Sequence, residues 1–225
     1  MSLRLQALSI IDALAEDLRT RIFRGELAGG TRLTETELAT KYDVARPTAK
    51  AAIEKLVTEG LLRRDVHKTA RIPHLDVGDI EDLYLSRACI EKEVARRLAP
   101  GRIVPEAARK AQADIVAAGD TWTIDIVEPD VRFHQSLVDA VGSSRTSRLY
   151  QVLMGEMRLC MAQIQSYGVT RASVISAEHQ AILDQIEAAD ADAAARTVAN
   201  HLERACRDLT RSLRATTTYG EAESS

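Results

Sequence analysis

Three histidines and one aspartate in the second half of the chain combine residue types and spacing that suit metal binding. Asp130 and His134 are four residues apart, so a helix places them one above the other on the same face. His179 and His201 each fall on a helical face whose other members are apolar. All three histidines of residues 76–225 are therefore predicted to point into a protein interior.

Burying these polar groups without partners is costly, which leaves two interpretations. In the first, each histidine is a hydrogen-bonded core residue, the usual role of a single buried imidazole. In the second, the three imidazoles and the carboxylate bind one divalent metal ion, because these groups are good ligands and facing helices can bring them together. The spacing alone leaves both interpretations open.

A second chemical signal is a short basic run near the start of a predicted helix. Arg46 and Lys50 are one helical turn apart on the face opposite Ile53 and Leu56, and Thr48 lies near them at the leading end. Arginine can bridge the O6 and N7 atoms of guanine, and lysine can donate to the same acceptors or to phosphate. The run is typical of a DNA-reading helix, and a solvated basic face is the alternative.

The elements around this run predict a compact DNA-binding domain over residues 1–75. Apolar spacing favours a first helix that begins near Ile11 and ends before Gly25, and a second at 34–41 whose Thr34 and Glu37 form a capping box. A third helix is predicted at residues 46–59, and a β-hairpin is predicted at residues 61–73. Three helices and a hairpin predict a winged helix-turn-helix, whose third helix enters the major groove.

The remaining chain is predicted to be entirely helical. Glycine, proline and aspartate breaks divide it into six segments, at residues 77–99, 105–119, 124–141, 144–167, 171–189 and 190–214. We therefore expect a mainly α protein in which residues 76–215 form an antiparallel bundle of about six helices. The polar residues 216–225 are expected to be a disordered tail.

Charge and composition agree with this division. Residues 1–75 carry 13 Lys and Arg against 10 Asp and Glu, net +3, whereas residues 76–225 carry 17 against 23, net −6. A basic N-terminal domain joined to an acidic C-terminal domain is the charge distribution expected of a protein whose first domain binds nucleic acid. No apolar run reaches the length of a membrane span, and the three dispersed cysteines exclude a disulfide framework. We expect a cytoplasmic protein without a membrane partner.

Two stretches carry a resemblance to a known family. GELAGGTRLTETELA (25–39) and VARPTAKAAIEKLVTEGL (44–61) are similar to the DNA-binding domain of the GntR family of bacterial regulators, and the resemblance covers residues 10–73. Family members generally begin the recognition helix with Ser-Arg-Thr-Pro. Here Ala45 cannot supply the side-chain cap of that serine, while Pro47 favours the first turn, so the helix is expected to begin one residue late.

The resemblance implies roles for individual residues of this domain. By position, Arg46, Thr48 and Lys50 would read DNA, and His67 with Lys68 would contact it from the wing.

A second resemblance concerns the helical half. The stretches DVRFH (130–134), EHQAI (178–182) and NHL (200–202) are similar to the sensor domain of the FadR subfamily, nearer its six-helix VanR branch. Metal-binding members place one Asp and three His at these positions. The resemblance therefore implies four metal ligands: Asp130, His134, His179 and His201. Zinc is the first expectation for the divalent ion, with nickel or manganese as alternatives.

The same resemblance implies an effector site. Sensors of this subfamily generally bind organic acids, and the resemblance places Arg87 toward the pocket, where its guanidinium can pair with a carboxylate. A salt bridge between Arg87 and Glu91 is the alternative role for this arginine.

These observations favour a transcriptional regulator, with repression as the preferred mode, whose operator affinity is set by a small carboxylate bound at the metal site. The resemblance also implies a homodimer on a palindromic operator. A metal-dependent hydrolase is the alternative, although no HExxH or GxSxG motif accompanies the ligands. A third interpretation is that the winged domain serves only for contacts with other proteins.

Overall fold

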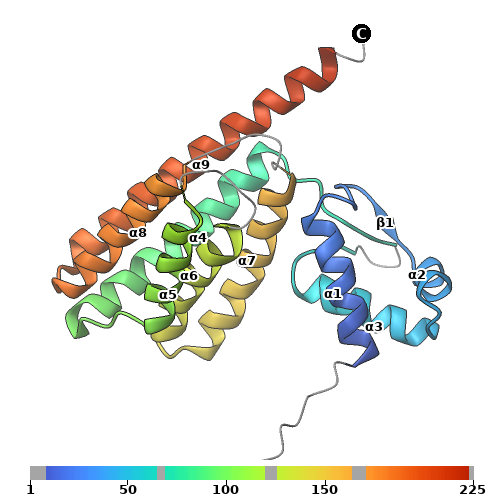
Figure 1. Cartoon of the computed structure of the whole chain (residues 1–225), viewed down its shortest axis with the longest axis horizontal. Helices are drawn as coiled ribbons and strands as arrows, with labels where there is room; N and C mark the ends of the chain where they lie inside the picture. The colour runs from blue at the N-terminus through green and yellow to red at the C-terminus, as the bar shows by residue number, and fades with distance from the viewer. Residues whose placement is uncertain (1–8, 65–68, 120–125, 164–170, 223–225) are drawn as a thin grey trace, which may run out of the picture. The chain divides into compact units, whose positions relative to one another are not determined.

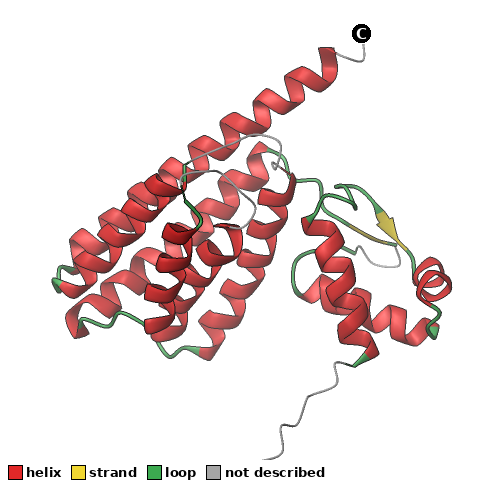
Figure 2. Cartoon of the chain, viewed as in Figure 1, coloured by secondary structure: helices red, strands yellow, loops and turns green. Residues whose placement is uncertain are grey.

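Apolar residues at three- and four-residue spacing form helices along most of the chain (Figure 1). The computed structural model divides the chain into two units, residues 1–74 and 75–225. It describes residues 9–64, 69–119, 126–163 and 171–222. Figure 2 shows that helix dominates both units and that a short strand appears in the N-terminal one.

The N-terminal unit is built on three helices, α1 (Ile10–Phe23), α2 (Glu35–Tyr42) and α3 (Arg46–Thr58). Helix α3 packs against both of the others. Their inward faces form one apolar core, which includes Leu14, Leu18, Ile22, Leu38, Ile53 and Leu56. The three-helix arrangement is the predicted one. The apolar residues whose spacing predicted the helices are the residues that form the core.

The wing of this unit is partly described. Strand β2 (Ala70–Arg71) pairs antiparallel with β1 (Arg32–Leu33), and Arg63 forms a further bridge to Arg71 through two backbone hydrogen bonds of 2.8 and 3.0 Å. The predicted hairpin thus has paired arms at Arg63 and Arg71, while residues 65–68 lie outside the described residues. Strand β1 was not expected, since two residues are too few for an alternating pattern.

The helix ends of this unit follow local chemistry. The Thr34 hydroxyl accepts a hydrogen bond from the Glu37 amide at 3.1 Å, but its own proton goes to the Glu37 carboxylate, so only half of the predicted capping box forms. Helix α3 begins at Arg46 without delay, and its N-cap Ala45 makes no side-chain hydrogen bond. Gly60 follows the helix with φ of +77°, a conformation that glycine adopts at low cost.

The C-terminal unit is an all-helical bundle. Its described residues form six α-helices, as predicted, and one short 3-10 turn: α4 (Val77–Leu98), η1 (Ala99–Gly101), α5 (Glu106–Ala117), α6 (Val127–Ala140), α7 (Ser144–Gln163), α8 (Ala172–Glu187) and α9 (Ala191–Ala222). Helix α4 contacts α6, α7, α8 and α9. Helix α5 packs instead against α6 and α8.

The end of α9 corrects one expectation. Residues 216–222 continue the helix, whereas the sequence analysis expects a disordered tail from residue 216. Threonine-rich composition lowers helix propensity, but extending an existing helix adds a hydrogen bond without a new nucleus. Among the described helices, none is both long enough and apolar enough to cross a bilayer.

The uncapped start of α3 leads to a stability prediction. Ala45 has the extended φ and ψ of −63° and 143° that a capping serine adopts, so Ala45→Ser should raise the free energy of unfolding by about 1 kcal/mol. Chemical denaturation followed by circular dichroism measures the change. The matched control, Ala51→Ser in the interior of the same helix, should lower stability by a few tenths of a kcal/mol. Equal effects of the two substitutions would contradict the capping argument.

Candidate metal centre and nucleic-acid interface

Three helices bring the predicted ligands together. Asp130 and His134 lie on α6, His179 on α8 and His201 on α9. One ligand atom from each residue lies within 4.8 Å of all the others. The ion-binding interpretation requires this convergence, because groups from separate helices must surround a single point.

The inward atoms of the cluster are imidazole Nε2 atoms and one carboxylate oxygen. His134 Nε2 lies 3.2 Å from His201 Nε2, while Asp130 Oδ1 lies 3.4 Å from His179 Nε2 and 3.9 Å from His134 Nε2. Phe133 stacks on the His179 ring with a centroid separation of 3.8 Å. Among the described residues, packing against Phe133 rather than a hydrogen bond holds the ring orientation of His179.

Two further carboxylates support the cluster from outside. Glu91 Oε2 lies 2.6 Å from His134 Nδ1, and Glu178 Oε2 lies 2.7 Å from His201 Nδ1. A carboxylate beside Nδ1 favours a proton on that nitrogen, which leaves the Nε2 lone pair free for a metal. Neither role was predicted from the sequence, although Glu178 adjoins His179 in the chain and Glu91 was a candidate partner of Arg87.

Burial keeps two of these imidazoles in the neutral form that binds metals. Burial, reinforced by His201 and His134, lowers the pKa of His179 well below its usual value. Burial also lowers the pKa of His201, although its hydrogen bond with Glu178 opposes the shift. Neutral imidazole offers a lone pair, whereas imidazolium does not.

The residues present fit a metal ion. Both nitrogens of His179 are buried, and neither finds a hydrogen-bond partner among the described residues. An unpaired polar atom in a protein interior is costly, and a cation bound at Nε2 would remove that cost for one of the two atoms. The donor set of three imidazoles and one carboxylate suits zinc and neighbouring divalent ions.

A buried charge network links the cluster to Arg87. Arg87 Nε donates to Glu91 Oε1 at 2.8 Å, and the Tyr150 hydroxyl donates to the same oxygen at 2.5 Å. Burial alone would raise the pKa of Glu91, but Arg87 and His134 outweigh it and hold that pKa far below its usual value. One ionised carboxylate therefore contacts both Arg87 and His134.

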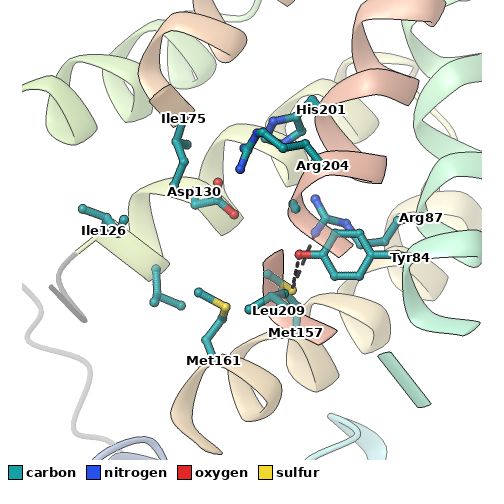
Figure 3. Close-up of a pocket in the computed structure, with 12 residues that line it drawn as sticks. Tyr84, Arg87, Ile126, Asp130, Met157, Met161, Ile175, His201, Arg204 and Leu209 are labelled. Carbon is teal, nitrogen blue, oxygen red and sulfur yellow. Dashed lines mark hydrogen bonds between the residues drawn. The ribbon is translucent and has the colours of Figure 1, made fainter. Parts of the chain in front are cut away.

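A cavity adjoins this network. It has a volume of about 40 Å³, and Arg87, Asp130, His201 and Arg204 are its charged or imidazole-bearing lining residues. Figure 3 shows the Arg87 guanidinium turned toward the cavity beside Tyr84. The Nη2 atom of Arg87 is buried and has no hydrogen-bond partner in the described part of the chain. Arg87 thus forms the salt bridge with Glu91 that was the alternative to its predicted effector-binding role, and its Nη2 donor has no partner among the described residues.

The candidate DNA-reading residues lie at the start of α3. Arg46 and Lys50 are exposed, Thr48 is partly exposed, and the opposite face of the helix carries the buried Ala49 and Ile53. Among the described residues neither Arg46 nor Lys50 makes an ion pair. The first turn of α3 therefore presents two free cations to solvent.

The second group of predicted DNA contacts belongs to the wing. His67 and Lys68 fall within residues 65–68, outside the described residues. Beside them, Arg64 pairs with Glu54 and Glu35, at 2.7 and 3.6 Å.

Comparison with known proteins assigns each unit to a domain family. Residues 10–72 match the family described as bacterial regulatory proteins, gntR family, and residues 82–204 match the FCD domain. The chain is 26% identical over 202 residues to YdhC of Bacillus subtilis, described as an uncharacterized HTH-type transcriptional regulator, with 85% of this chain and 87% of that protein covered. It is 25% identical over 218 residues to the transcriptional repressor NanR of Citrobacter rodentium, with 85% and 82% covered.

A solved structure shares the fold. A putative transcriptional regulator GntR from Rhodococcus sp. RHA1 superposes with a TM-score of 0.72 at 22% identity, over 88% of this chain and 96% of that one. The N-terminal unit and the helical bundle thus recur together in one known architecture. The chain belongs to the GntR family of bacterial transcriptional regulators, in the FadR/VanR-type subfamily that joins a helix-turn-helix domain to an FCD domain.

Proposed function

We propose that this regulator is a repressor whose operator affinity is controlled by a small organic acid, bound beside a divalent metal ion in the FCD domain. The observation that carries the proposal is the convergence of four ligand atoms next to a buried guanidinium with an unpartnered donor. Repression is favoured because NanR, a relative matched over most of this chain, is described as a repressor.

The metal would be held by the four residues of the cluster: Asp130, His134, His179 and His201. Zinc suits three imidazoles and a carboxylate best, and nickel or manganese are the alternatives. A bound ion supplies positive charge and open coordination positions for an anionic oxygen. Glu91 and Glu178 would hold two of the imidazoles in the ligating tautomer.

Arg87 would bind the effector's carboxylate. Its Nη2 atom is buried and finds no partner among the residues that the structure describes, and a carboxylate accepts such donors strongly. A cavity volume of about 40 Å³ holds about three water molecules, so the acid must be small or must widen the site as it enters.

Glu91 would couple the effector to the metal. It contacts Arg87 through one oxygen and His134 through the other, so a change in the position of Arg87 alters the charge beside a metal ligand. An effector changes DNA affinity only if it binds one arrangement of the protein more tightly than another.

The DNA-binding half would act as one head of a homodimer on a palindromic operator. A single winged domain makes few contacts, and paired heads on two half-sites supply both affinity and spacing selectivity. Arg46, Thr48 and Lys50 would contact bases or nearby phosphates, and His67 with Lys68 would contact the backbone from the wing. Because its target is bacterial DNA, we place the protein in the cytoplasm.

A metal-dependent hydrolase, the alternative considered from the sequence, receives no support from the comparisons. Both matched domains and the described relatives are those of transcriptional regulators rather than enzymes. The same metal ligands therefore serve as a sensor in this proposal and catalyse no reaction.

The metal site can be tested by removing ligands. The double substitution His134→Ala and His179→Ala should abolish metal binding, because two of four ligands are lost. Elemental analysis of the purified protein after dialysis against zinc measures occupancy. The control His74→Ala removes an exposed histidine of the N-terminal unit and should leave occupancy unchanged. Full occupancy in the double variant would place the metal elsewhere.

The supporting role of Glu91 can be tested without removing a ligand. Glu91→Gln preserves shape but removes the charge beside His134, and we expect metal affinity to fall by about 10- to 100-fold. Competition with a chelator of known affinity gives the value. Glu93→Gln, an exposed change on the same helix, should have no effect, and equal affinities for both variants would refute the role.

The DNA interface can be tested at the start of α3. Arg46→Ala should weaken binding to the cognate operator by about 1 to 3 kcal/mol and relax base selectivity at the contacted position. Gel-shift titration against operator variants measures both effects. Arg97→Ala, an exposed substitution in the helical unit, is the matched control. An unchanged affinity and footprint for Arg46→Ala would contradict the proposed docking.

A further inference from the structure

The cavity beside the metal cluster has two chemically different ends. Asp130, His201 and Arg204 lie together at one end, and Arg87 enters from the side (Figure 3). Ile126 and Met161 lie at the end away from His201. The cavity is therefore polarised, and an occupant with one charged end and one apolar end would match it.

Side chains from three elements build the apolar end. Met161 comes from α7, Leu209 from α9, and Ile126 directly precedes α6. Met157, one turn before Met161, borders the polar end, because its Sδ atom accepts from the Tyr84 hydroxyl at 3.5 Å and from Arg87 Nη1 at 3.6 Å. All four side chains are at least nine-tenths buried. Methionine is flexible and polarizable, so it can pack against apolar groups of different shapes. A hydroxyl or carboxylate placed here would lose its hydrogen bonds to water without replacement.

The arginine of the polar end does not offer a second free cation. Arg204 donates from Nε to Glu178 Oε1 at 2.5 Å and from Nη2 to Glu178 Oε2 at 2.6 Å. Its Nη1 donates to Asp208 at 3.0 Å. Two carboxylates therefore already balance the charge of Arg204, whereas Nη2 of Arg87 has no hydrogen-bond partner within the described ranges of the chain. Arg204 therefore offers no charge for a further carboxylate, and Arg87 and the proposed metal ion are the cations left to bind one at this end of the cavity.

We propose that the effector is a short monocarboxylic acid with an apolar tail, which lies against Met161, Ile126 and Leu209 while its carboxylate faces Arg87. The inference rests on the proposed effector function and narrows its ligand class. It excludes dicarboxylates and polyhydroxy acids as preferred ligands, because their distal polar groups would be buried among apolar side chains.

Matched small acids provide the first test. Butyrate and 3-hydroxypropionate have the same number of non-hydrogen atoms and differ by a terminal methyl in place of a hydroxyl. Isothermal titration of the zinc-loaded full-length protein should give about tenfold tighter binding for butyrate. Malonate, which adds a second carboxylate, should bind more weakly than butyrate.

The outcomes separate this inference from the proposal on which it rests. If 3-hydroxypropionate or malonate binds as tightly as butyrate or more tightly, the apolar-tail inference is wrong while the carboxylate effector stands. If none of the three acids binds although zinc is present at full occupancy, both are overturned.

A substitution at the apolar end provides a second test. Met161→Gln keeps the side-chain length but adds an amide, so the tenfold preference for butyrate over 3-hydroxypropionate should fall to about twofold or less. The control Leu149→Gln changes an exposed residue of the same helix and should leave the preference unchanged. An unaltered preference in a folded Met161→Gln variant would show that the tail lies elsewhere. If that variant does not fold, the comparison of the three acids still decides the inference.

Discussion

The arrangement of the FCD domain depends on the burial of one ionised carboxylate. Glu91 is 5% exposed, and it contacts Arg87, His134 and Tyr150 from three different helices. A buried charge is tolerated only where opposite charge and hydrogen bonds replace the lost water. Helices α4, α6 and α7 must therefore keep the separation at which these contacts form. This separation also sets the positions of the side chains in the cavity and in the candidate metal centre.

The same network would let the proposed metal ion and the proposed effector share one site. Arg87 uses one donor to hold Glu91 and keeps another at the cavity wall, while Glu91 uses its second oxygen beside His134. A ligand that binds Arg87 would weaken or strengthen the hydrogen bond between Arg87 and Glu91. Such shared groups would couple the proposed effector to the proposed metal ion, since either one would change the electrostatic field at the other.

The DNA-binding unit is simpler, because its chemistry lies on the surface. The core of the three helices is apolar throughout, and the exposed Arg46 and Lys50 cost nothing to keep in water. Their proposed contact with DNA requires only that the opposite face of α3 be fixed by Ala49, Ile53 and Leu56. A helical period in the sequence is therefore sufficient to predict which face of α3 is exposed.

Periodicity in the sequence therefore determined the helices, the inward direction of the three histidines and the outward direction of Arg46 and Lys50. These properties depend on residues three or four apart, whose relation a helix fixes locally. Strand β1 was not predicted, because its pairing with β2 joins segments that are distant in the sequence. The helix over residues 216–222 was not predicted, because threonine-rich composition suggested disorder.

Only the tertiary structure decided what the inward groups contact. The i,i+4 spacing of Arg87 and Glu91 suggested their salt bridge, but the approach of Glu91 to His134 and of Glu178 to His201 depends on how separate helices pack. The division of the cavity into a polar and an apolar end likewise comes from side chains on α4, α6, α7 and α9. Contacts between helices have no fixed sequence separation, so no local pattern encodes them.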